Sequence, residues 1–164
     1  MILLANRDGL RNKRLHRRIN NRFQTGSTFG SVQLRVATYR ERGPYRVVAE
    51  TNPRTFLEDE EYPTKTARLE IGFDVDSPPD YDFYWFNWVE PERSLLLGWH
   101  QDDDHPEYGE VHLQLNQSKS AVICKRVEFI GEHPMEVVEA RLELLPDVVQ
   151  AIKWERGSVT EVDW

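Results

Sequence analysis

The sequence predicts an α+β domain: a mostly antiparallel, twisted sheet of about six to seven strands, with a basic helix at the N-terminus and one or two C-terminal helices packed on one face. Two observations lead to this prediction. Segments in which apolar and polar residues alternate follow one another through the middle of the chain, whereas helical periodicity is confined to its two ends. The chain also lacks a GxGxxG or P-loop string, which argues against a nucleotide-binding βαβ fold.

The chain has the size of one domain. It contains 164 residues, of which 39% are hydrophobic, and its five Trp, six Tyr and seven Phe can fill a core. We divide it into a basic helical leader (1–24), a single α+β domain (25–157) and a tail (158–164). The last eight residues could alternatively form a short edge strand. No run of about 18 apolar residues could span a bilayer, and residues 1–5 are too short for the apolar centre of a secretion signal. We therefore expect a cytoplasmic protein without a membrane partner.

Both expected helices are amphipathic. After Asp8, a candidate N-cap, apolar residues recur at spacings of five, four and four, and Pro134 suits the first turn of a second helix. Pro146 lies inside this second pattern and would either kink the helix or start another one. The apolar positions are Leu10, Leu15, Ile19 and Phe23 in the first helix, and Val138, Leu142, Leu145, Val149 and Ile152 in the second.

Strands are expected between these helices. The segment 82–89 is aromatic on both faces, as is typical of a central strand, and 95–100 with 110–116 is typical of a hairpin. The polar connection 51–65 is long for a compact domain, so it is either functional or poorly ordered. The expected strands are 31–39, 45–50, 68–75, 82–89, 95–100, 110–116 and 121–129.

Positive charge is concentrated at the N-terminus. The net charge is −7, but residues 1–22 carry +6 and the remaining 142 residues therefore carry −13. Clustered arginines are suited to neutralising phosphates, and the candidate nucleic-acid-binding residues are Arg11, Lys13, Arg14, Arg17 and Arg18. A solvated helix docked on the acidic body and an arm for a partner protein are the alternatives. Arginine outnumbers lysine 16 to 5, which together with the acidity is typical of a halophilic composition.

Residues 100–112, "HQDDDHPEYGEVH", hold three of the five histidines with five carboxylates between them. A histidine with a pKa near neutrality can take a proton from a ribose 2′-hydroxyl while another protonates the leaving oxygen. We assign His105 and His112 as acid and base, in either order. Asp104 and Glu110 are the candidate carboxylates that orient these rings.

Two other interpretations of this stretch stay open. His100, His105 and His112 with Asp102 or Asp104 supply ligand types for a divalent metal ion, although their spacings match no compact ligand string. We therefore assign no cofactor and leave a divalent metal as an option. Alternatively, the stretch is a solvated loop without a catalytic role. Cys124 lies in an apolar run and is expected to be an inert thiol.

Residues 82–145 resemble the TumE-like toxins of type II toxin–antitoxin systems. The segment "YWFNWVEPERSLLLGW" is similar to the paired strands of that family, "DDDHPEYGEVH" to its histidine segment and "HPMEVVEARLEL" to its C-terminal helix. The family has a histidine pair before the proline and more histidines on the second strand, whereas this chain has only His105 before Pro106 and only His112 on the strand. The resemblance implies a toxin that acts on RNA and is bound by a cognate antitoxin.

Two functional hypotheses follow. In the first, the chain is a toxin-like ribonuclease that uses the histidines and carboxylates for acid/base cleavage and the basic leader for phosphate contacts. In the second, it is a non-enzymatic module that binds protein or nucleic acid and has an inactive site. The first hypothesis requires that the imidazoles of His105 and His112 share one pocket.

Overall fold

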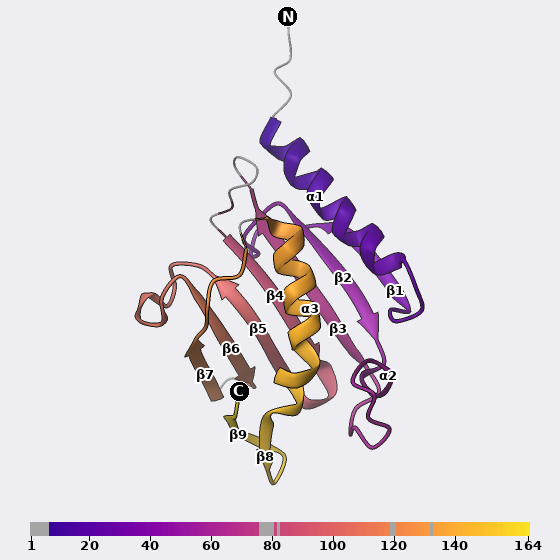
Figure 1. The fold of residues 1–164 in the computed structure, drawn as a ribbon, viewed down its shortest axis with the longest axis vertical. Coiled ribbons are helices and arrows are strands. Elements are labelled where there is room, and N and C mark those ends of the chain that lie inside the picture. Colours follow the sequence, from indigo (N-terminus) through magenta and orange to yellow (C-terminus); the bar gives the residue numbers. More distant parts are fainter. Residues whose placement is uncertain (1–6, 76–80, 82, 119–120, 132) are drawn as a thin grey trace, which may run out of the picture.

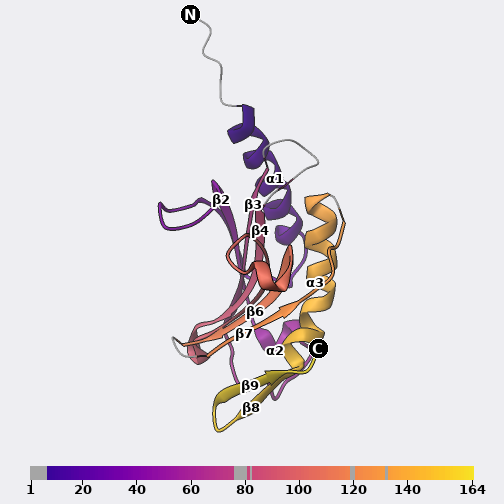
Figure 2. The same cartoon turned by 90° about the vertical axis from the view of Figure 1, so that its left-hand side faces the viewer.

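The computed structural model describes residues 7–75, 81, 83–118, 121–131 and 133–164. Its main feature is one antiparallel sheet in which seven strands lie in chain order (Figure 1). The two long helices, α1 (Arg7–Gln24) and α3 (Pro134–Gln150), lie on the same face of this sheet (Figure 2). The strands are β1 (Ser31–Val36), β2 (Tyr45–Thr51), β3 (Ala67–Asp74), β4 (Phe83–Glu90), β5 (Leu95–Gln101), β6 (Val111–Gln117) and β7 (Ala121–Arg126). The expected α+β class is confirmed.

The strands form where the sequence alternates, because alternation gives a sheet one apolar face. The apolar face of the sheet lies under the two helices, and its residues include Leu69, Phe86, Leu97 and Leu113, all at most 2% exposed. Strand β4 is in the middle of the sheet and is buried on both faces along most of its length, as its aromatic sequence predicts. We call the face that bears no described helix the open face. No helix in the described ranges is long and apolar enough to cross a membrane.

Helix α1 packs on the sheet and contributes to the core. Leu15, Ile19 and Phe23 are buried against it, whereas Leu10 is half exposed. Removal of residues 1–22 would therefore delete core side chains as well as the positive charge.

Two polar side chains of α1 bind the end of β3 beyond its pairing with β2. The β2 register reaches only Ile71, so the later backbone groups of β3 need other partners. Asn12 accepts from the Val75 N–H and donates to the Val75 carbonyl. One turn further on, His16 Nε2 accepts from the Phe73 N–H at 3.2 Å while Nδ1 lies 2.6 Å from the Asn12 carbonyl. This helix face is therefore buried although two of its members are polar.

The burial of His16 makes the fold sensitive to acid. Burial lowers the pKa of His16 from 6.5 to about 4, and a backbone bond to Asn12 opposes this only in part. The unfolded chain therefore binds the proton more tightly, and this contribution to stability is complete above pH 6.5 and is lost as the pH falls toward 4. At about 1.4 kcal/mol per pH unit, the loss reaches roughly 3 kcal/mol.

We expect the free energy of unfolding, measured with urea, to fall more steeply between pH 6.5 and 4 in the wild type than in His16→Gln. The glutamine has no proton to gain in this range. Comparing the change with pH, and not the stability at a single pH, removes the packing cost of the substitution. Equal pH dependence of the two proteins would contradict this expectation.

The C-terminal part contains one long helix and a small hairpin. Helix α3 continues through Pro146 without a break into two helices. The chain then forms β8 (Ile152–Glu155) and β9 (Ser158–Val162), which pair with each other in a separate sheet. The segment 158–164, expected to be a tail, therefore contains a strand, and its Val159 and Val162 are buried.

The polar connection 51–65 is ordered by a few side chains. It contains a four-residue helix, α2 (Pro53–Phe56), which is capped by Asn52. Leu57 and Tyr62 are buried in the main core, and the Tyr62 hydroxyl donates to the buried carboxylate of Glu90. The length of this connection therefore reflects packing over the end of the sheet.

Candidate histidine–carboxylate site

A row of side chains crosses the open face of the sheet. Directly paired residues of an antiparallel sheet point to the same face. The register pairs Trp85 of β4 with His100 of β5, His100 with His112 of β6, and His112 with Arg126 of β7. The hairpin formed by β5 and β6 therefore brings two imidazoles side by side, with ring centroids 5.6 Å apart.

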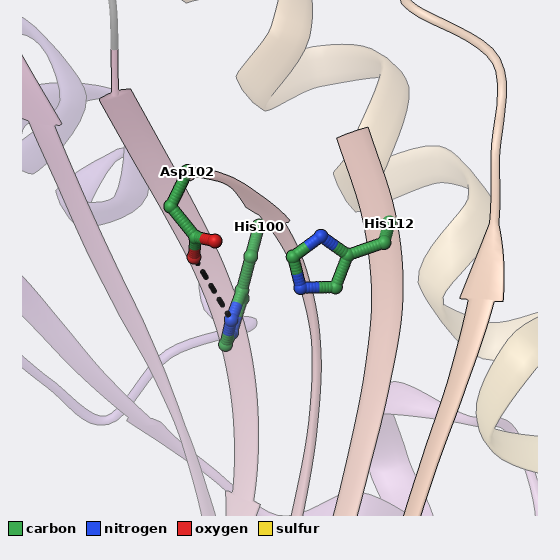
Figure 3. Close-up of side chains that lie close together, drawn as sticks. All are labelled: His100, Asp102 and His112. Carbon is green, nitrogen blue, oxygen red and sulfur yellow. Dashed lines mark ion pairs between the residues drawn. The ribbon is translucent and has the colours of Figure 1, made fainter. Parts of the chain in front are cut away.

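His100 is held in one orientation by β4. Its Nε2 lies 2.7 Å from the side-chain oxygen of Asn87, an acceptor, so Nε2 carries the proton. Burial lowers the pKa of His100 to about 4, and the charge of Asp102 and a side-chain hydrogen bond with Gln114 oppose this shift only in part, so the ring is neutral at pH 7. The lone pair of Nδ1 therefore points away from Asn87, and Asp102 Oδ2 lies 3.9 Å from this nitrogen (Figure 3).

Gly98 makes this orientation possible. It pairs with Asn87 across β4 and β5, and the Asn87 side chain lies over it on the way to His100. A Cβ atom at residue 98 would lie 2.0 Å from Asn87 Oδ1 and 2.6 Å from the Phe86 carbonyl oxygen. Glycine is therefore required at this position by close packing and not by a positive φ.

His112 is completely buried although it lies on the open face. Its exposed fraction is 0%, and neither of its ring nitrogens has a hydrogen-bond partner within the described part of the chain. The loop between β5 and β6 folds back over it, so that the rings of His105 and Tyr108 lie 5.2 and 6.4 Å from the His112 ring. The three histidines of residues 100–112 therefore gather in one cluster.

The loop is shaped by a short 3-10 helix, η2 (Pro106–Tyr108), which ends at Gly109. Gly109 has a φ of 87°, which favours glycine. A Cβ atom at this residue would also lie only 2.9 Å from Nε of Arg126. Contact with β7 therefore completes the fold of the loop over His112.

The carboxylates nearest to the imidazoles differ from the expected ones. Asp102 faces His100, and Glu107 Oε1 lies 3.5 Å from His105 Nδ1. No hydrogen bond or ion pair joins Asp104 or Glu110 to a histidine among the described residues. Asp104 instead donates its backbone N–H to the Asp102 side chain.

The sequence contained a signal for Asp102. It follows His100 by two residues, and residues i and i+2 of a strand point to the same face. Glu110, by contrast, lines a shallow pocket on the outer side of the loop, together with Arg42, Gln101, Asp102 and Asp103.

The basic residues of α1 are far from this cluster. Helix α1 covers β1 to β3 on the helical face (Figures 1 and 2). The strand register assigns His100 and His112 to the open face of β5 and β6. Of the arginines, Arg22 forms an ion pair with Glu139 of α3 at 2.6 Å. Lys13 is half-buried, and the exposed arginines of the predicted nucleic-acid-binding set are Arg11, Arg14, Arg17 and Arg18. A single short substrate cannot contact both regions.

Cys124 lies in the next row of the open face, paired with Gln114. Burial raises the pKa of its thiol, and the nearby carboxylates of Glu107 and Asp102 raise it further. A thiol that resists ionisation is a poor nucleophile, which agrees with the expected inert role.

The fold and the site together define an α+β protein with a seven-stranded antiparallel sheet and a separate two-stranded sheet. A partly buried histidine–carboxylate cluster lies under a loop on the open face of the large sheet. Comparison with protein-family models, with curated proteins and with solved structures finds no match for this chain.

Proposed function

We propose that this protein is an RNA-acting enzyme of the toxin–antitoxin type, and that the cluster under the loop between β5 and β6 is its reactive site. One observation supports the proposal most directly: the rings of His105 and His112 pack edge to face at 5.2 Å. Acid/base cleavage of RNA needs two proton-transfer groups near one another, and imidazoles suit this role at neutral pH. The sequence resemblance of residues 82–145 to TumE-like toxins supports the same function and adds a cognate antitoxin as partner.

The side chains of His105 and His112 differ in solvent exposure, and this difference suggests different positions relative to a substrate. The side chain of His105 is 33% exposed, whereas His112 is 0% exposed. His105 is therefore the group that contacts the RNA, with Glu107 beside its Nδ1 to orient the ring. His112 lies directly behind it, and neither of its ring nitrogens has a hydrogen-bond partner among the described residues, so it can exchange a proton when the loop opens.

The test compares wild-type protein with His105→Ala. We expect the wild type to cleave a single-stranded oligoribonucleotide, but not the DNA of the same sequence, and to inhibit growth when its expression is induced. Loss of a general acid or base typically costs 10²–10⁴-fold in rate, so we expect a drop of at least about 100-fold in His105→Ala. Gel analysis of a labelled oligonucleotide measures this rate.

The matched control is His133→Asn. His133 caps α3 by accepting from the Met135 N–H, and asparagine can form the same cap, so this variant removes an imidazole without altering the fold. It should cleave RNA like the wild type. Full activity of His105→Ala, or no cleavage and no growth inhibition by folded wild type, would contradict the proposal.

The exposed arginines of α1 support the alternative of a binding module. These side chains are exposed, and helix α1, which carries them, packs on the face of the sheet opposite the histidine cluster. In the same experiment, the triple variant Arg14→Glu, Arg17→Glu, Arg18→Glu leaves Leu15 and Ile19 in the core. Loss of nucleic-acid or partner binding in this variant, together with unchanged behaviour of His105→Ala, would identify a binding module without acid/base chemistry.

A further inference from the structure

We propose that His100, Asp102 and His112 bind a divalent transition-metal ion of the zinc class. A ligand atom from each of these side chains lies within 4.8 Å of the other two (Figure 3). The inference concerns binding of the ion and does not depend on RNA as the substrate. In the metal-bound form His112 is a ligand, and the acid/base role proposed above for His112 belongs to the metal-free form.

His112 provides the first reason. It is the most deeply buried member of the cluster, and both of its ring nitrogens lack a hydrogen-bond partner within the described residues. Buried polar atoms in folded proteins are almost always paired, because an unpaired one has lost its contact with water without compensation. A metal ion between the strands accounts for one of these nitrogens, and the neighbouring ligands point to the same place.

His100 provides the second reason. A metal-binding histidine typically donates its other ring N–H to an oxygen of the protein, which sets the tautomer and the ring orientation. Here Nε2 of His100 donates to the Asn87 side chain at 2.7 Å. The unprotonated Nδ1 is thereby held toward Asp102, in the form that binds a metal.

Asp102 provides the third reason. Its Oδ2 and the lone pair of His100 Nδ1 are two acceptors that face each other at 3.9 Å. Two acceptors that face each other repel, and a metal cation bound between them turns this repulsion into attraction to both. A tetrahedral zinc ion with bonds of about 2.0–2.2 Å holds its ligand atoms roughly 3.4 Å apart. Small side-chain rotations therefore bring the three groups to bonding distance. Asp102 Oδ1 accepts the Asp104 N–H, which leaves Oδ2 as the atom that faces His100.

The ligand types define the class of ion. Two imidazoles and one carboxylate suit zinc and its neighbours in the first transition series, whereas magnesium and calcium prefer oxygen ligands throughout. Three protein ligands leave one tetrahedral position for water. His105 is the nearest additional imidazole, since its ring lies 5.2 Å from that of His112. The metal would also offset the negative charge of the loop, where Asp102, Asp103 and Asp104 follow one another.

The test is a titration of the full chain after dialysis against a chelator. We expect calorimetry to show one equivalent of Zn²⁺ bound, and Co²⁺ to give the intense visible absorption of a tetrahedral site. Asp102→Asn should weaken Zn²⁺ binding by at least about tenfold, because it removes the only anionic ligand. His112→Gln, checked for folding by circular dichroism, should weaken binding at least as much.

Two control variants distinguish a specific zinc site from nonspecific attraction of cations to the acidic loop. Asp104→Asn removes the same charge two residues further along the loop, and His133→Asn removes an imidazole far from the cluster. Both should bind Zn²⁺ like the wild type, and Mg²⁺ should not compete. The proposal is overturned if Asp102→Asn binds like the wild type, if Asp104→Asn loses as much affinity, or if the wild type binds no equivalent of Zn²⁺. None of these readouts depends on RNA cleavage.

Discussion

Glu90→Ala is expected to lower the free energy of unfolding by about 3–5 kcal/mol, the cost of breaking a buried ion pair by removal of one partner. The Glu90 side chain is fully buried and accepts four hydrogen bonds. Tyr62 and Trp88 donate to Oε1 at 2.6 and 2.7 Å. Arg93 and Thr64 donate to Oε2 at 2.7 and 3.3 Å. Removal of the carboxylate leaves these donors without this acceptor and breaks the side-chain bonds of Tyr62 and Thr64, in the connection 51–65, to β4. Urea denaturation at pH 7 measures the loss.

Glu92→Ala is the matched control for this substitution. Glu92 follows Glu90 by two residues, is exposed, and accepts a single side-chain hydrogen bond from Thr66 at 2.7 Å. Surface substitutions of this kind usually change stability by about 0.5 kcal/mol or less. Equal free energies of unfolding for Glu90→Ala and Glu92→Ala would contradict the prediction. The hydrogen bonds to Glu90 would then stabilise the fold no more than the single bond to Glu92.

Gly98→Ala should destabilise the protein by about 1–3 kcal/mol and displace Asn87 from His100. The added methyl group would lie 2.0 Å from Asn87 Oδ1 and 2.6 Å from the Phe86 carbonyl, and overpacking of this kind has a cost of that size. The backbone oxygen cannot rotate away, so β4 and β5 must shift relative to each other. Without the bond from Asn87, His100 is free to rotate, and we expect Zn²⁺ affinity to fall about 10–100-fold.

Gly30→Ala tests whether the effect is specific to Gly98. A Cβ atom at Gly30 has no heavy atom within 4 Å, and this residue does not have a positive φ. Its replacement by alanine should therefore be neutral or stabilise the fold by about 0.4–1 kcal/mol through the unfolded chain. Zinc affinity should not change. Equal behaviour of the two alanine variants would rule out the close contact as the cause.

The strands and long helices were predicted well because their signals are local. Alternation in 110–116 assigned Val111, Leu113 and Leu115 to one face and His112 to the other, and this assignment is confirmed. The hairpin of β8 and β9 was missed because each strand is short, and its pairing depends on contacts that no local pattern reveals. The same limit applies to Pro146, where packing on the sheet keeps one helix continuous.

The gathering of the histidines was predicted only in part. Their clustering in residues 100–112 was visible in the sequence, and the fold does bring His100, His105 and His112 together. The partners of these rings were not visible. Asn87 reaches His100 from a neighbouring strand, and this contact depends on the register of β4 with β5. The acids expected to orient the rings, Asp104 and Glu110, make no such contact with them among the described residues.

The sequence by itself determined the fold class, the faces of the strands and the hairpin that carries the histidines. These depend on the period of apolar residues, which is a property of a few neighbouring positions. Only the tertiary structure decided that His112 is buried without a hydrogen-bond partner among the described residues, and that the arginine-rich helix α1 packs on the opposite face of the sheet. Strand register and loop closure decide such features, and both depend on packing between segments far apart in the chain.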